Sequence, residues 1–97
     1  MAKGYWIAQV TVKDPETYEK YKAANAIAFA KYGGLFIVRG GAQAVKEGTT
    51  HPRSVVIEFP DYAAALACYE SPEYKSALAI RQGISDGNLV IVEGYDS

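Results

Sequence analysis

The chain of 97 residues contains few of the residue types that most often carry chemistry. It has one cysteine, Cys68, which excludes an internal disulfide framework and a cysteine-rich metal site. Its only histidine, His51, lies in a polar loop beside Pro52, and one histidine with scattered carboxylates makes a poor metal site. We therefore expect neither a metal ion nor a bound cofactor.

An excess of charge of one sign is also missing. Ten basic residues against eleven acidic ones leave a net charge of -1, so no overall field attracts nucleic acid or an anionic membrane surface. No apolar run approaches the roughly 18 residues needed to span a bilayer. The first ten residues lack the apolar length and the cleavage site of a signal peptide. These absences favour a cytoplasmic protein without nucleic-acid or membrane partners.

Strand-like and helix-like segments alternate along the chain. Strands are predicted at 4–12, 35–39, 53–60 and 88–95. Between them, cap residues and prolines predict a helix of about 18 residues starting after Asp14, a second starting at Asp61, and a third from Pro72 to about Gln82. The order βαββαβ is that of the ferredoxin-like fold. Right-handed crossovers then give an antiparallel sheet in the order 4-1-3-2, within one α+β domain over 1–97.

Side chains alternate between the two faces of a strand, and this sorts the predicted sheet into two sets. The wholly apolar set should lie under the helices: Trp6, Ala8, Val10, Val12, Phe36, Val38, Val55, Ile57, Phe59, Val90 and Val92. The other set is mixed: Tyr5, Ile7, Gln9, Thr11, Leu35, Ile37, Arg39, Ser54, Val56, Glu58, Leu89, Ile91 and Glu93. A solvent-facing sheet does not normally carry so many apolar residues together. We therefore expect a homodimer in which a second copy covers this face, making a dimeric α+β barrel.

Tyrosines recur at helical spacing and predict the helix faces that meet the sheet. One stripe is Tyr18, Tyr21, Asn25, Ala28 and Tyr32, and the other is Tyr62, Leu66 and Tyr69. Both stripes fit ordinary core packing. A cavity lined by tyrosines would also suit an aromatic or other planar ligand, because each buried hydroxyl needs a partner.

The stretch RGG at 39–41 is neither a Walker loop nor a dinucleotide fingerprint, because the spaced glycines and the following helix are missing. The topology gathers Arg39, Arg53 and Arg81 at one end of the sheet. We expect an anionic metabolite to bind near Arg39 and Arg81, with its apolar body toward the stripes that contain Tyr21 and Tyr69. The alternative is that the arginines only pair with carboxylates such as Glu47.

Glu58 and Glu93 end two strands that flank the first strand, at a predicted separation of roughly 10 Å. Two carboxylates so placed could perform acid–base chemistry on a substrate between them. They could equally be structural anchors for a lysine, a tyrosine or the partner subunit. The residues thus leave two functions open: a small-molecule enzyme of the cofactor-independent kind, and a binding dimer without catalysis.

At this level of detail the chain resembles a bacterial family known as domain of unknown function 1330, within the dimeric α+β barrel superfamily. The resemblance rests on GYWIAQVTVKDPETYEKY, KYGGLFIVRGGA, RSVVIEFPDYAAALACYESPEY and DGNLVIVEG, which together cover most of residues 4–94. The loop before the third strand departs from the family, because it reads EGTTHPR where members commonly carry a tryptophan. The resemblance implies a small homodimer, with monooxygenases and isomerases among the more distant relatives.

Overall fold

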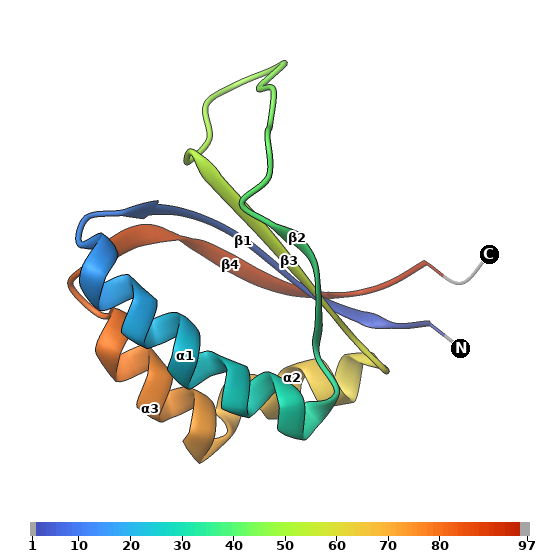
Figure 1. Ribbon diagram of the computed structural model, residues 1–97. Coiled ribbons are helices and arrows are strands. Elements are labelled where there is room, and N and C mark those ends of the chain that lie inside the picture. The colour runs from blue at the N-terminus through green and yellow to red at the C-terminus, as the bar shows by residue number, and fades with distance from the viewer. Residues whose placement is uncertain (1, 96–97) are drawn as a thin grey trace.

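The computed structural model describes residues 2–95. Within them the elements follow the order β1 (Gly4–Val12), α1 (Pro15–Tyr32), β2 (Leu35–Arg39), β3 (Arg53–Phe59), α2 (Tyr62–Glu70), α3 (Pro72–Arg81) and β4 (Ser85–Glu93). The strands form one antiparallel sheet in the order β2-β3-β1-β4. All three helices cover the same face of this sheet (Figure 1). The predicted ferredoxin-like topology is confirmed.

The helices begin and end at the cap residues that the sequence predicts. Asp14 caps α1 by accepting a hydrogen bond from the backbone N–H of Thr17, and Gly33 ends the helix in the left-handed conformation at φ 78°. Ser71 separates α2 from α3, and its side chain accepts from the N–H of Tyr74 at 3.1 Å. Local sequence therefore accounts for these three helix boundaries, which position the helices over the sheet.

Trp6 lies at the centre of the core and is 1% exposed. Its indole N–H donates to the carbonyl of Ala65 in α2 at 2.8 Å. Its ring meets Phe29 of α1 edge-on at 5.1 Å and Tyr74 of α3 at 4.8 Å between centroids. Aromatic pairs of this geometry contribute roughly 0.5–1.5 kcal/mol each beyond the area they bury. One side chain of β1 thus contacts all three helices.

Strand β4 begins at Ser85, three residues before the predicted start at Asn88. The segment SDG at 85–87 lies outside the predicted strand, but it pairs with the end of β1, so that Gly87 lies opposite Val10. A side chain at Gly87 would collide with the backbone carbonyl oxygen of Gln9. The glycine therefore permits a close approach of two strands rather than a reversal of the chain.

The predicted faces of β4 were wrong. Leu89 and Ile91 pack against the core, opposite Ala8 and Trp6, whereas Val90 is 55% exposed. Both alternating sets of this strand are apolar, so a period of two residues carries no information about which set is buried. Only the pairing with β1 decides it.

A register shift in β2 reverses the predicted faces of Val38 and Arg39. The pairing passes from Phe36 with Ile57 to Val38 with Val56, so Ile37 is the extra residue of a bulge. Residues directly opposite each other in a ladder share a face. Arg39, which pairs with Val55, therefore belongs to the side of the sheet that the helices cover.

The stripe predicted on α1 is confirmed, whereas the stripe on α2 is confirmed only for Tyr69, which packs against the core. Tyr62 and Leu66 are 37% and 40% exposed, and Ala65 and Cys68 are buried instead. This helix reads YAAALACYE and is apolar on every side, so spacing alone cannot select its buried face. Burial raises the pKa of the Cys68 thiol to about 12, which fits a packing role.

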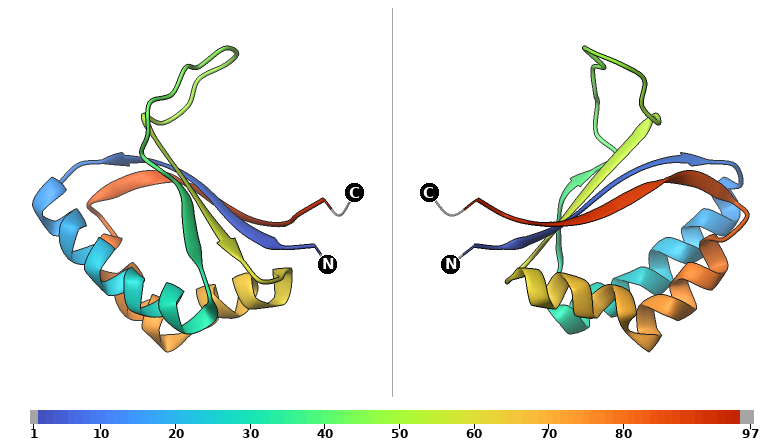
Figure 2. Two further views of the ribbon diagram at one scale, coloured as in Figure 1. Left: turned by 45° about the vertical axis from the view of Figure 1, so that its right-hand side comes forward. Right: turned by 180° about the vertical axis from the view of Figure 1, so that it is seen from behind.

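The second face of the sheet has no helix over it (Figure 2). Apolar side chains on this open face include Ile7, Val38, Val90 and Val92, which are 40–55% exposed. The loop 40–52 connects β2 to β3 and projects beyond this end of the sheet, away from the helices (Figure 2). No helix of residues 2–95 combines the length and the apolar character needed to cross a membrane.

The pairing of Gly87 with β1 generates the first prediction. Gly87→Ala should lower the free energy of unfolding by about 1–3 kcal/mol, because the added methyl group must displace the backbone of β1. Urea unfolding measures the change. Gly41→Ala is the matched control, since a Cβ at Gly41 meets nothing within 4 Å. Equal stability of the two variants would contradict the extended β4.

Candidate functional site

A small cavity lies between α1 and the sheet, at the end where β2 stops and β3 starts. It has a volume of about 40 Å³. Its charged and polar wall is formed by Tyr18, Tyr21, Lys22, Asn25, Arg39, Arg53, Arg81 and Asn88. Its apolar wall is formed by Trp6, Ala8, Val10, Phe36, Val55, Ile57, Phe29 and Leu89. The topology that gathers three arginines at one end of the sheet was foreseen, and the structure brings all three to the cavity.

Each arginine rests on an aromatic ring. The guanidinium carbon of Arg39 lies 4.1 Å from the ring centroid of Phe36. The corresponding distances are 5.8 Å from Arg53 to Tyr18 and 5.5 Å from Arg81 to Tyr21. Cation–π contacts of this kind contribute about 0.5–1 kcal/mol at exposed sites and more when desolvated. The aromatic side chains thus orient three cations without neutralising them.

Gly40 accounts for part of the RGG stretch. It has φ 69° and donates its N–H to the carbonyl of Ser54 at 2.8 Å. A Cβ on Gly40 would lie 2.9 Å from the guanidinium carbon of Arg53. This glycine therefore ends β2 and leaves space for the Arg53 head group, whereas Gly41 borders open space.

Within residues 2–95 the arginines of the cavity have no acidic partner. None of the ion pairs there involves Arg39, Arg53 or Arg81, and the alternative pairing with Glu47 is not formed. Glu19 lies near Arg39 and Arg53, but its Oε2 forms an ion pair with Lys22 Nζ at 2.6 Å. The hydrogen bond with Lys22 lowers the pKa of Glu19, and the arginine charges add to this effect.

Tyrosine hydroxyls surround Arg81. Tyr21 and Tyr74 share a buried hydrogen bond of 2.9 Å. Burial opposes the charge of Arg81, but the nearby hydroxyls of Tyr74 and Tyr21 raise its pKa overall, so the guanidinium stays protonated. Burial raises the pKa of Tyr18, and the positive charge of Arg53 partly offsets this shift. Burial therefore keeps Tyr18 a neutral hydrogen-bonding group at neutral pH.

Several buried polar atoms around the cavity have no partner within residues 2–95. Asn25 is 4% exposed, and its Oδ1 accepts no hydrogen bond from these residues. The Nε atoms of Arg53 and Arg81 are likewise buried and unpaired. A buried polar group without a partner costs about 1–3 kcal/mol, so such groups indicate a place for water or a ligand. Helical spacing placed Asn25 toward the sheet, but nothing in the sequence distinguished it as a site residue.

Tyr69 does not line this cavity. It packs on Trp6 and Tyr74 at 5.7 and 5.2 Å between centroids. It borders a wider groove of about 480 Å³ along the free edge of β4. Arg81, Asn88 and Leu89 line both the cavity and the groove, so the two spaces adjoin. Of the four predicted ligand-binding residues, Arg39, Arg81 and Tyr21 line the cavity, and Tyr69 lines the adjoining groove.

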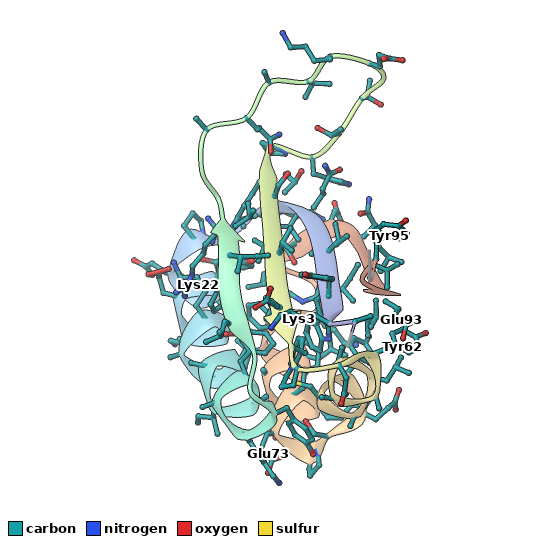
Figure 3. All side chains as sticks on the ribbon, turned by 90° about the vertical axis from the view of Figure 1, so that its right-hand side faces the viewer. Lys3, Lys22, Tyr62, Glu73, Glu93 and Tyr95 are labelled. Carbon is teal, nitrogen blue, oxygen red and sulfur yellow. The ribbon has the colours of Figure 1, made fainter. Side chains whose placement is uncertain are left out.

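Glu58 and Glu93 do not form a pair. Glu58 lies opposite Tyr5 and Glu93 lies opposite Gly4, so the two side chains belong to different faces of the sheet. Glu58 accepts from the Tyr5 hydroxyl at 3.4 Å and approaches Lys3 Nζ at 3.7 Å. In Figure 3, Lys3 is labelled near the middle of the molecule, whereas Glu93, the last residue of β4, lies at the right-hand side. The geometry thus offers no acid–base dyad here.

The loop 40–52 contributes no metal site. His51 shares a hydrogen bond of 2.8 Å between its Nδ1 and Thr11 Oγ1, and Thr50 Oγ1 donates to the carbonyl of His51. Residues 2–95 contain no group of three or more histidine, cysteine, aspartate or glutamate side chains able to hold a metal ion. Thr49, Thr50 and Gly48 are exposed at the tip of the loop.

Solved structures share this fold across nearly the whole chain. A protein of unknown function from Rhodopseudomonas palustris, RPA0582, has a TM-score of 0.78 at 18% identity, covering 99% of this chain and 85% of the other. SnoaB, a cofactor-independent oxygenase from Streptomyces nogalater, has a TM-score of 0.65 at 16% identity, covering 100% and 97%. A dimeric ferredoxin-like protein of unknown function from Thermobifida fusca has a TM-score of 0.53 at 19% identity, covering 95% and 89%.

Comparison of the sequence with known proteins and families identifies one family. No curated protein matches the chain significantly. The family described as "Domain of unknown function (DUF1330)" matches residues 3–95. Because this match spans almost the entire length, the protein with its arginine-lined cavity under a ferredoxin-like sheet belongs to the DUF1330 family.

Proposed function

We propose that the protein is a homodimer that binds a small anionic metabolite in the cavity lined by Arg39, Arg53 and Arg81. The observation that carries this proposal is the presence of three guanidinium groups at one cavity without a carboxylate partner among residues 2–95. Arginine presents donors in a planar fork that matches the oxygens of a carboxylate or phosphate. An anion would also give partners to the unpaired Nε atoms of Arg53 and Arg81.

A second copy of the chain is the best cover for the open face of the sheet. Ile7, Val38, Val90 and Val92 are 40–55% exposed there, and Leu35 at the edge is 62% exposed. A contiguous apolar patch of this kind is typical of an interface. A protein of similar fold from Thermobifida fusca is described as dimeric, which supports the same arrangement here.

Catalysis without a cofactor is the second candidate function. SnoaB, which has a similar fold, is described as a cofactor-independent oxygenase. In this chain the buried carboxamide of Asn25 lines the cavity together with the hydroxyl-bearing side chains of Tyr18 and Tyr21. These polar groups could orient a reacting substrate. Oxygen consumption in the presence of candidate aromatic substrates separates this function from binding alone.

The proposed dimer predicts how two matched substitutions differ. Ile7→Asp should dissociate or unfold the protein, because it places a charge on the open face of the sheet, where the second copy would pack. Ile27→Asp is the control, since Ile27 is 65% exposed on the outer side of α1. Light scattering on a size-exclusion column gives the mass of each variant. A monomeric wild type at micromolar concentration, or an unchanged Ile7→Asp dimer, would overturn the arrangement.

The proposed anion site predicts stabilisation by organic acids. An acid at ten times its Kd should stabilise the wild type by about 1.4 kcal/mol and raise its Tm by several degrees. Arg39→Ala should lose most of this shift, because Arg39 is exposed at the cavity entrance and its removal leaves the core intact. Lys46→Ala, in the exposed loop, should keep it. If the same acids shift all three proteins equally, Arg39 is not an anchor.

A further inference from the structure

The cavity holds more positive charge than a single carboxylate can balance. Lys22 is already paired with Glu19, but Arg39, Arg53 and Arg81 are not paired with any acid of residues 2–95. No aspartate or glutamate lines the cavity. A monoanion would therefore leave two like charges uncompensated in a partly desolvated space, where charges interact more strongly than in water.

The donors converge from three elements rather than from one. Arg39 comes from the end of β2, Arg53 from the start of β3 and Arg81 from the end of α3. Each head group is oriented by an aromatic ring, and Gly40 leaves the space that Arg53 occupies. Such an arrangement suits a compact group with several oxygens in different directions, because each guanidinium can then bind a different oxygen.

The size of the cavity limits what can enter it. A volume of about 40 Å³ accommodates a few water molecules or one compact head group, since a single water needs roughly 10–15 Å³ by this measure. The adjoining groove along β4 is about 480 Å³, within the range of ordinary ligand sites. Arg81 and Leu89 border both spaces, so the groove is the neighbouring space for the organic part of a ligand whose charge lies in the cavity.

We propose that the cavity selects a compact oxyanion group with two negative charges, of the phosphomonoester type, and that the organic part of the ligand lies in the groove beside Tyr69 and Leu89. This inference rests on the proposed anion site and narrows its ligand. Asn25 contributes a carboxamide to the same cavity, and the NH₂ group of this side chain can donate to an oxygen of the head group.

Calorimetric titrations at pH 8 and constant ionic strength test the charge requirement. Inorganic phosphate, which is a dianion at this pH, should bind at least tenfold more tightly than dimethyl phosphate, a monoanion with the same central atom. Malonate should likewise bind more tightly than acetate if two charges alone suffice, and phosphate should exceed malonate if one compact head is required. Phenyl phosphate should bind more tightly than phosphate, because its ring reaches the groove.

Two variants assign the selectivity to the arginines. Arg53→Gln should reduce the preference for phosphate over dimethyl phosphate at least fivefold, and Arg39→Gln, at a more exposed position, provides the same test should Arg53→Gln fail to fold. Lys46→Gln should leave the preference unchanged. Equal binding of phosphate and dimethyl phosphate would overturn the inference while the anion site stands. Failure of every anion to bind would overturn both.

Discussion

The packing of Trp6 is the interaction on which the arrangement depends. Its side chain leaves β1 and meets α1, α2 and α3 through Phe29, Ala65 and Tyr74. Because a single buried ring contacts every helix, it holds the helical layer in position over the sheet. The interior is filled less completely at the end where β2 stops and β3 starts. The cavity lies there, bounded by the same aromatic core.

The chemistry of the cavity follows from how aromatic and cationic groups are combined. Phe36, Tyr18 and Tyr21 provide faces on which the guanidinium groups rest, and they supply no negative charge. A carboxylate in place of any of them would neutralise an arginine and remove its capacity to bind an anion. The same positive groups that oppose one another in the free protein thus favour an anionic ligand. Stability and binding therefore act in opposite directions at this site.

The two faces of the sheet carry different groups. The covered face contains the core and the arginine cavity, and the open face contains exposed apolar residues, which we propose a second subunit covers. The bulge at Ile37 connects these roles, since it moves Val38 to the open face and Arg39 to the covered one. Glu58, with Tyr5 and Lys3, remains on the open side, away from the cavity.

Strong local signals determined the order of elements: Asp14, Gly33 and Ser71 mark helix ends by hydrogen bonds within a few residues, and Val10 lies between the polar residues Gln9 and Thr11. The convergence of arginines at one end followed from topology alone. Tertiary structure decided the faces of β4, the buried side of α2 and the direction of Arg39. In β4 and α2 every alternative face is apolar, so the sequence pattern fits two arrangements equally. The bulge depends on pairing with β3, and the unpartnered Asn25 depends on a cavity that several elements enclose. Contacts between distant segments are therefore what brought these residues together around one cavity.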